Sequence, residues 1–303
     1  MAKRVTPEME RINRKNHTRD GREKTHSYWT DAWFRLKRNP TAVAGLVVIT
    51  LMILMAVFAP VVAPYGYAEV DKGAMCVKPC AAHIFGTDSL GRDLFSRCVY
   101  GARWSLGLGL ICMFLSLAGG GVLGLIAGYF GRKTDTLIMR IMDVFQAIPG
   151  TLMAITVVAT LGTGTPQLLL ALALSSMPMM ARVVRGAILT VRKSDYIESS
   201  RAIGAGNMRL MVRHMLPNAL GHIIIYAVGS VAGSIMVIAM LSYIGLGVQP
   251  PTPEWGALLN EGKKFYNLYP YMILYPGLMI MISVLALNLF GNGLRDALDP
   301  RLK

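Results

Sequence analysis

The chain has 303 residues, of which 53% are hydrophobic and 16% charged, and its formal net charge is +14. Ordinary soluble domains carry about 25% charged residues, so this composition excludes a typical soluble protein. A basic excess can indicate nucleic-acid binding, but the apolar segments leave no soluble domain in which base-reading side chains could gather. The composition therefore indicates a protein surrounded by membrane lipid, with no nucleic-acid partner.

Six apolar runs, each of about 20 residues, are long enough to cross a bilayer as helices. They lie at residues 41–63, 104–128, 136–161, 167–190, 219–246 and 271–292. Backbone polar groups in lipid must be satisfied within the segment, which predicts an all-α polytopic membrane protein with six transmembrane helices. No run carries an unpaired charge near its centre. This argues against a carrier driven by an ion gradient.

The basic residues indicate the orientation of these spans. With a cytoplasmic N-terminus, the inner segments are residues 1–40, 129–143, 182–217 and 293–303, and they hold 24 of the 31 Lys and Arg residues. This distribution is the positive-inside bias of a multi-spanning inner-membrane protein. We expect both termini to lie in the cytoplasm.

The first 40 residues form a basic tail that ends in an amphipathic segment, residues 28–38. Apolar side chains recur there at helical spacing, at Trp29, Ala32, Trp33 and Leu36. This pattern is typical of a helix on the inner leaflet. Residues 1–27 have few apolar residues, which predicts a disordered or loosely attached tail. The run 41–63 follows a long charged segment and is predicted to be a retained anchor, not a cleaved signal peptide.

The first outer segment, residues 64–103, contains a polar motif that begins at Phe85. Asp88 is predicted to cap a short helix on the outer surface, with Leu94 and Cys98 on its apolar side. The candidate site residues of this motif are Asp88, Gly91, Arg92, Asp93 and Arg97. Two interpretations are open: a contact surface for an extracytoplasmic partner, or a structural lid that packs on the helix bundle.

Neither metal binding nor catalysis is indicated. Cys76 and Cys80 lie in the outer segment, where they can form a disulfide or remain two thiols. No His stands at a zinc-like spacing from them. The segment 256–263 resembles a phosphate loop but has the wrong spacing. The chain is predicted not to be an enzyme, so energy for pumping would come from another subunit.

Small residues within the spans predict close helix packing. Gly120, Gly124 and Gly128 recur every four residues, a spacing that lets two helix backbones approach in lipid, either within the subunit or with a second one. Gly229 and Gly233 repeat the pattern more weakly.

Arg140 and Asp143 lie one helical turn apart near the inner end of the third run. They can form a structural ion pair or take part in gating.

Residues 195–217 are a charged, glycine-containing interruption between two apolar runs. Asp195 and Glu198 fit a capping box that opens a short helix ending at Ile203. The sequence Gly204-Ala205-Gly206 then favours a sharp turn.

Asn207 is predicted to cap a second short helix, which Pro217 closes. A polar hairpin of this kind is stable only outside the bilayer core. It can dock on a soluble partner or rest on lipid headgroups, and both interpretations fit the residues.

The same segment resembles the EAA signature of binding-protein-dependent ABC importer permeases. The matching positions are Glu198, Gly204, Leu216 and Pro217. The signature has two alanines and an isoleucine at the positions where this chain carries Ser199, Ser200 and His214. Three further stretches, residues 85–97, 245–256 and 288–300, are similar to the DppC/OppC group of peptide permeases.

The resemblance implies a type I ABC importer permease bundle with a cytoplasmic coupling helix, its core at residues 104–303, in a bacterial plasma (inner) membrane. The implied partners are a second homologous permease subunit, two cytoplasmic nucleotide-binding ATPase subunits that hold ATP and Mg, and an extracytoplasmic substrate-binding protein. This chain itself holds no cofactor. The implied ATPase-coupling residues are Glu198, Ser199, Ser200, Arg201, Gly204, Ala205, Gly206, Leu216 and Pro217. Di- or oligopeptides are the implied cargo, with nickel complexes or glutathione as alternatives.

Overall fold

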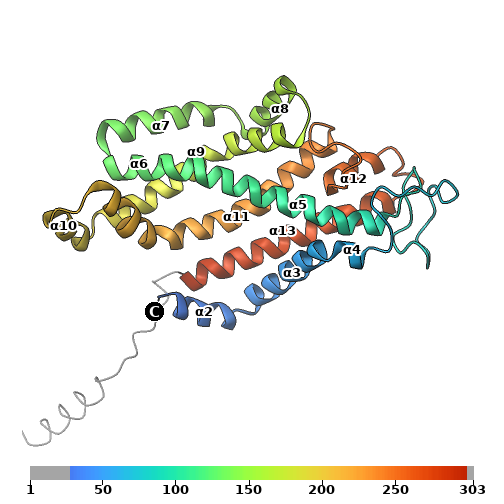
Figure 1. Cartoon of the computed structure of the whole chain (residues 1–303), viewed down its shortest axis with the longest axis horizontal. Coiled ribbons are helices and arrows are strands. Elements are labelled where there is room, and N and C mark those ends of the chain that lie inside the picture. Colours follow the sequence, from blue (N-terminus) through green and yellow to red (C-terminus); the bar gives the residue numbers. More distant parts are fainter. Residues whose placement is uncertain (1–27, 299–303) are drawn as a thin grey trace, which may run out of the picture.

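A computed structural model describes residues 28–298 as an elongated bundle of helices (Figure 1). Within this range no strand forms, and an isolated bridge joins Thr87 and Asp93. This confirms the predicted all-α class. The helices are α2 (Tyr28–Arg38), α3 (Pro40–Val57), α4 (Ala59–Val62), α5 (Leu94–Ser116), η1 (Leu117–Gly121), α6 (Val122–Phe130), α7 (Arg132–Ala147), α8 (Gly150–Leu161), α9 (Thr165–Arg192), α10 (Asp195–Ala202), η2 (Arg209–Met215), α11 (Leu216–Tyr243), α12 (Trp255–Gly262) and α13 (Tyr271–Leu298); η1 and η2 are π-helices.

Five helices of the described range are long and apolar enough to cross a membrane. They are Pro40–Val57, Leu94–Phe130, Thr165–Arg192, Arg209–Tyr243 and Tyr271–Leu298. The predicted third run is not one straight helix, because α7 and α8 meet at an angle of 81°. Ile148 precedes Pro149 and is extended (φ −91°, ψ 126°), since proline disfavours the helical conformation of the residue before it. The predicted number of six spans holds if this bent pair counts as one.

The predicted helix start at Asp88 is wrong, and so is the separate surface helix. Asp93 is the N-cap of α5, and its carboxylate accepts a hydrogen bond from the amide of Ser96 (2.7 Å). The predicted surface helix is the first part of α5, which continues through η1 and α6 to Phe130. The spanning helix thus begins ten residues before the apolar run, because interior partners satisfy its polar groups.

The glycine row of the second span packs directly against α9. A Cβ at Gly120 would lie 2.4 Å from the carbonyl oxygen of Met177, and a Cβ at Gly124 would lie 2.3 Å from that of Ala181. The predicted close helix pair is confirmed, and it lies within this subunit. At Gly229 and Gly233 a Cβ would meet no atom within 4 Å, so no close helix contact forms there within this subunit. Packing of this pair against a second subunit stays a prediction.

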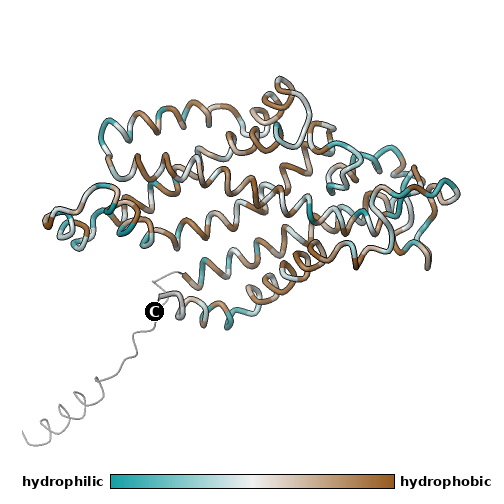
Figure 2. The backbone as a smooth tube through the Cα atoms, in the orientation of Figure 1, coloured by the Kyte–Doolittle hydropathy of each residue, from teal (hydrophilic) through white to brown (hydrophobic). Residues whose placement is uncertain are grey.

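The two ends of the bundle are hydrophilic and the middle is apolar (Figure 2). α2, α10 and the last turns of α13 lie at one end, whereas α12 and the loop between α4 and α5 lie at the other (Figure 1). The predicted helix 28–38 is present as α2, with Ala32 and Leu36 buried. The predicted basic tail, residues 1–27, and the last five residues, 299–303, lie outside the described range.

Candidate functional site

Residues 195–208 form a bent projection at one end of the bundle, here called the elbow (Figure 1). Its first limb is α10. The predicted N-cap at Asp195 is wrong, because Ser194 holds that position with extended geometry (φ −80°, ψ 140°). No side chain makes a capping hydrogen bond there, so the predicted capping box with Glu198 is absent.

The predicted turn after α10 is confirmed. Gly204 has φ +87°, a conformation that costs an L-residue with a Cβ about 1–3 kcal/mol. The amide of Ala205 donates to the carbonyl of Ser200 (3.1 Å), which closes the turn. A Cβ at Gly204 or Gly206 would meet no atom within 4 Å, so the turn is open to contact from outside.

The second limb is not the short helix that the sequence predicts. The helix that follows the turn continues through η2 into α11, and Pro217 lies within it. The π turns before Pro217 widen the helix where the ring would otherwise clash with the carbonyl four residues earlier. Asn207 does not act as a cap; its side-chain oxygen accepts a hydrogen bond from the Tyr129 hydroxyl (2.6 Å).

The elbow has an exposed tip and a buried base. Ile203 is 87% exposed and Met208 is 68% exposed, on either side of the glycine turn. Ile197 and Leu210 are buried in the main core cluster, together with residues of α9 and α11. The base of the elbow is therefore packed against two spanning helices.

Most of the remaining predicted coupling residues lie on this elbow, and two lie outside it. Glu198, Ser199 and Arg201 are exposed, and Ser200 is half-buried. The Ser200 hydroxyl donates to the carbonyl of Tyr196 (2.7 Å), so it is satisfied within α10. Leu216 and Pro217 are set apart from the tip, at the start of α11.

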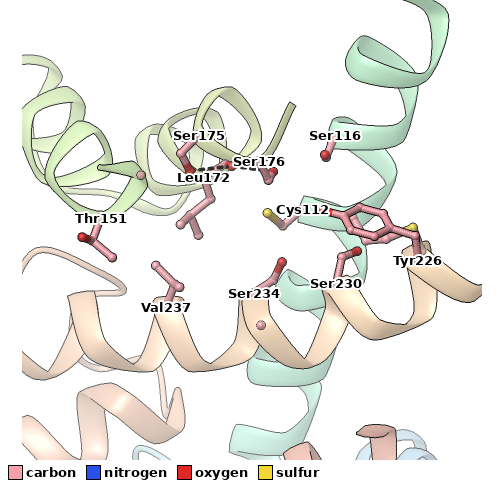
Figure 3. A pocket seen from close by; sticks show the side chains of 13 residues that line it. Cys112, Ser116, Thr151, Leu172, Ser175, Ser176, Tyr226, Ser230, Ser234 and Val237 are labelled. Carbon is pink, nitrogen blue, oxygen red and sulfur yellow. Dashed lines mark hydrogen bonds between the residues drawn. The ribbon is translucent and has the colours of Figure 1, made fainter. Parts of the chain in front are cut away.

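A cavity of about 370 Å³ lies between α5, α8, α9 and α11 (Figure 3). Its lining residues are Cys112, Met113, Ser116, Gly150, Thr151, Leu172, Ser175, Ser176, Tyr226, Ser230, Gly233, Ser234 and Val237. The cavity lies close to the midpoints of three spanning helices, as the positions of Cys112, Ser176 and Ser230 show. Its mouth is at exposed Gly150, Thr151 and Gly233.

Sequence reasoning missed this cavity. The usable signal is the recurrence of Tyr226, Ser230 and Ser234 every four residues in an otherwise apolar run. Such spacing places hydroxyls on one face of a helix, and polar side chains in a span face a bundle interior or a partner.

The charged residues of the outer motif are buried, which excludes them as an exposed contact surface of the isolated subunit. Arg97 bonds Asp88 Oδ2 (2.6 Å) and Glu261 Oε2 (2.5 Å), and Arg92 bonds the same two oxygens (both 2.7 Å). This network, here called the outer clasp, balances two positive against two negative charges and ties the outer loop to α5 and α12. The contacts support the interpretation as a structural lid.

Gly91 allows the backbone of the same loop to pack closely on itself. Its φ is +80°, and a Cβ there would lie 1.9 Å from the carbonyl oxygen of Asp71.

The predicted pair of Asp143 with Arg140 is wrong. Asp143 bonds Arg182 of α9 instead (2.6 Å), and both side chains are partly exposed.

The cysteine alternatives are resolved for this structure, in which Cys76 and Cys80 are free thiols. Burial, with a smaller contribution from the Asp88 carboxylate, raises the pKa of the Cys76 thiol. Among residues 28–298 no cluster of His, Cys, Asp or Glu could hold a metal ion.

Membrane-length helices, a cavity with hydroxyl side chains near their midpoints and a projecting elbow are together the features expected of a membrane transport subunit. The chain belongs to the family described as binding-protein-dependent transport system inner membrane component, whose model matches residues 120–303. A second model, the N-terminal TM domain of oligopeptide transport permease C, matches residues 27–79.

Characterised relatives cover nearly the whole chain. It is 43% identical over 277 residues to the dipeptide transport system permease protein DppC of Alkalihalophilus pseudofirmus, covering 91% of each chain. It is also 43% identical over 281 residues to the glutathione transport system permease protein GsiD of Escherichia coli, again covering 91% of each. Among solved structures, an inward-facing MetNI methionine ABC transporter matches with a TM-score of 0.56 at 21% identity, covering 68% of this chain and 98% of that one.

These findings establish the class of activity. The chain is a multi-pass inner-membrane permease subunit of an ABC importer, and its family works with ATPase and binding-protein partners. The structural match supports the fold of an ABC importer permease.

Proposed function

We propose that this chain forms one half of a translocation pathway and that its elbow is the coupling element on which an ATPase subunit acts. The observation that carries the proposal is the elbow itself. Its tip presents apolar Ile203 and Met208 around a turn without side-chain bulk, and its base is fixed in the core. Such a shape suits a groove on a partner.

The cavity supports the half-pathway. Hydroxyl side chains from four helices line this hollow at the middle of the spans, and polar side chains in a span usually face a bundle interior or a partner. We assign its mouth to the side that faces a second, homologous permease subunit. Two such halves would enclose a path for cargo, which an extracytoplasmic binding protein delivers at the end that carries α12 and the outer clasp.

The elbow end is assigned to the cytoplasm, together with both termini. There the two nucleotide-binding subunits would hold ATP and Mg and close on each other. In this assignment the permease chain holds neither, and it converts their closure into a displacement of α9 and α11.

Di- or oligopeptides are the proposed cargo. The relatives named for dipeptide and for glutathione transport have the same identity to this chain, and glutathione is itself a small peptide. Glutathione and nickel complexes remain the alternatives. Uptake of labelled dipeptide, glutathione and nickel by cells with and without the gene separates them, and loss of nickel uptake alone would contradict the peptide assignment.

Two glycine substitutions test the coupling role. Gly206→Trp adds a large side chain where φ is outside the left-handed region, whereas Gly204→Ala adds backbone strain with little bulk. We expect Gly206→Trp to insert and assemble normally but to uncouple ATP hydrolysis from uptake, and Gly204→Ala to retain more transport. Normal uptake with Gly206→Trp would refute docking of the turn.

An ion-gradient carrier is the competing class. Proteoliposomes of the purified importer separate the two, because uptake should follow added ATP and should not follow an imposed proton or sodium gradient. Purification of the tagged chain should also recover a second permease and nucleotide-binding subunits.

A further inference from the structure

The cavity between α5, α8, α9 and α11 is lined by hydroxyl and apolar side chains without charge, which limits the chemical groups that it can bind. We propose that Ser176, Ser230 and Ser234 contact the cargo during passage and recognise its uncharged main-chain amides, not its charged side chains. This inference rests on the proposed function and deepens it, since it names cargo-contacting residues and the part of the cargo that they contact.

Two of the three serine hydroxyls donate within their own helices and are left as acceptors. Ser176 Oγ donates to the carbonyl of Leu172 (2.7 Å) and Ser230 Oγ donates to the carbonyl of Ala227 (2.7 Å). Each hydrogen is thereby directed to the serine's own helix, which leaves the oxygen lone pairs for another donor. A peptide N–H group is a donor of the required kind.

Donors for cargo carbonyl groups are present in the same cavity. Within the described residues, the hydroxyls of Tyr226 and Thr151 have no hydrogen-bond partner, and both residues line the hollow. A peptide unit offers one N–H and one C=O, so this mixture of acceptors and donors matches a main chain whatever its side chains are.

The position of the side chains supports a shared site. Figure 3 shows Ser230 and Ser234 on one wall of the cavity and Ser175 and Ser176 on the other, with the Cys112 thiol between them. The volume of about 370 Å³ lies within the range of roughly 300–1,000 Å³ that is usual for small-molecule sites.

None of the described lining residues is charged. A charged cargo group in this hollow therefore has no counterion among the lining residues. The ion pair of Asp143 and Arg182 is not among the lining residues. Selection by charge would have to come from an introduced side chain, which makes the proposal testable.

The test uses the complete importer in proteoliposomes, with Ser234→Asp and Ser234→Lys as opposite variants and Ser234→Ala as the neutral one. The probes are alanyl-lysine, alanyl-glutamate and dialanine, whose uptake rates are compared. The binding protein is identical in every preparation, so its own preference cancels when ratios are compared between variants. Asn267→Asp and Asn267→Lys, in the exposed loop before α13, control for the added charge alone.

We expect Ser234→Asp to raise the ratio of alanyl-lysine to alanyl-glutamate uptake by about tenfold and Ser234→Lys to lower it by about tenfold, because Coulomb interactions are strong away from water. Ser234→Ala and both Asn267 variants should change this ratio by less than about twofold, because none of them places a charge inside the cavity. Unchanged ratios in both charged variants, with dialanine uptake retained, would overturn the proposal.

A second measurement covers charged variants that fail to assemble. Ser234→Cys in a background with Cys112→Ala places a single thiol in the cavity, and its labelling by a small methanethiosulfonate reagent is followed during turnover. Dialanine should slow labelling several-fold, and labelling that is unaffected by dialanine would overturn the proposal. A parent importer that takes up no peptide would contradict the proposed function instead, so the two failures are distinguishable.

Discussion

Arg97→Met is expected to destabilise the outer end of the bundle strongly. The Arg97 side chain is 1% exposed and bonds Asp88 Oδ2 at 2.6 Å and Glu261 at 2.5 and 3.1 Å. Its removal leaves Asp88 and Glu261 to share Arg92 as the remaining cation of the clasp, and one buried negative charge is uncompensated.

The magnitude follows from this imbalance. Removing one partner of a buried ion pair costs ~3–5 kcal/mol. Glu261 is 20% exposed and keeps some contact with water, so we expect a loss of about 3 kcal/mol, at the lower end of that range. Adding Glu261→Gln to Arg97→Met restores the charge balance and should recover more than ~1 kcal/mol of the loss.

The assay is equilibrium unfolding of the purified subunit in mixed micelles, titrated with denaturing detergent. Lys264→Met is the matched control, because Lys264 is an exposed cation just after α12. Removing it should change the free energy of unfolding by less than ~0.5 kcal/mol. The reasoning is refuted if Arg97→Met is no more destabilising than Lys264→Met, or if Glu261→Gln adds to the loss.

Two further predictions concern packing and thiol chemistry. Gly124→Leu should lower the free energy of unfolding by ~1–3 kcal/mol, because even a Cβ at this position overlaps the α9 backbone. Gly186→Leu on α9 is the control and should be nearly neutral in the same titration, because a Cβ at Gly186 meets no atom within 4 Å. Equal effects of the two would contradict the packing. Cys76 should react with iodoacetamide more slowly than exposed Cys80, because burial and Asp88 disfavour its thiolate. Because the pKa of Cys76 is raised, its alkylation rate should still increase with pH where the rate of an unperturbed thiol has levelled off. Faster alkylation of Cys76 than of Cys80 would contradict this.

The spans and their packing could be predicted from the chain because they depend on local signals. Apolar length marks the spanning helices, and the four-residue glycine row marks the close contact with α9. The turn at Gly204 was also predictable, since its conformation is one that glycine adopts without strain.

Features that depend on tertiary partners were not predictable. Asp88 stands where a helix cap is plausible, but its two arginine partners hold it in the loop and Asp93 caps α5 instead. Pro217 is a strong helix breaker in isolation, yet π turns accommodate it in a continuous helix. The cavity hydroxyls come from four separate helices, so only the four-residue spacing within α11 is visible in the sequence.

The most direct test of the central claim is site-specific photocrosslinking from the elbow tip in the assembled importer. A benzophenone side chain at Ile203, 87% exposed, is compared with one at Leu268, which is 72% exposed. Leu268 belongs to the segment between α12 and α13, and α12 lies at the opposite end of the bundle from α10 (Figure 1). Position 203 should crosslink to a nucleotide-binding subunit, and position 268 should not. Crosslinking of position 203 only to lipid or to the extracytoplasmic binding protein would contradict the assignment of the elbow as the coupling element.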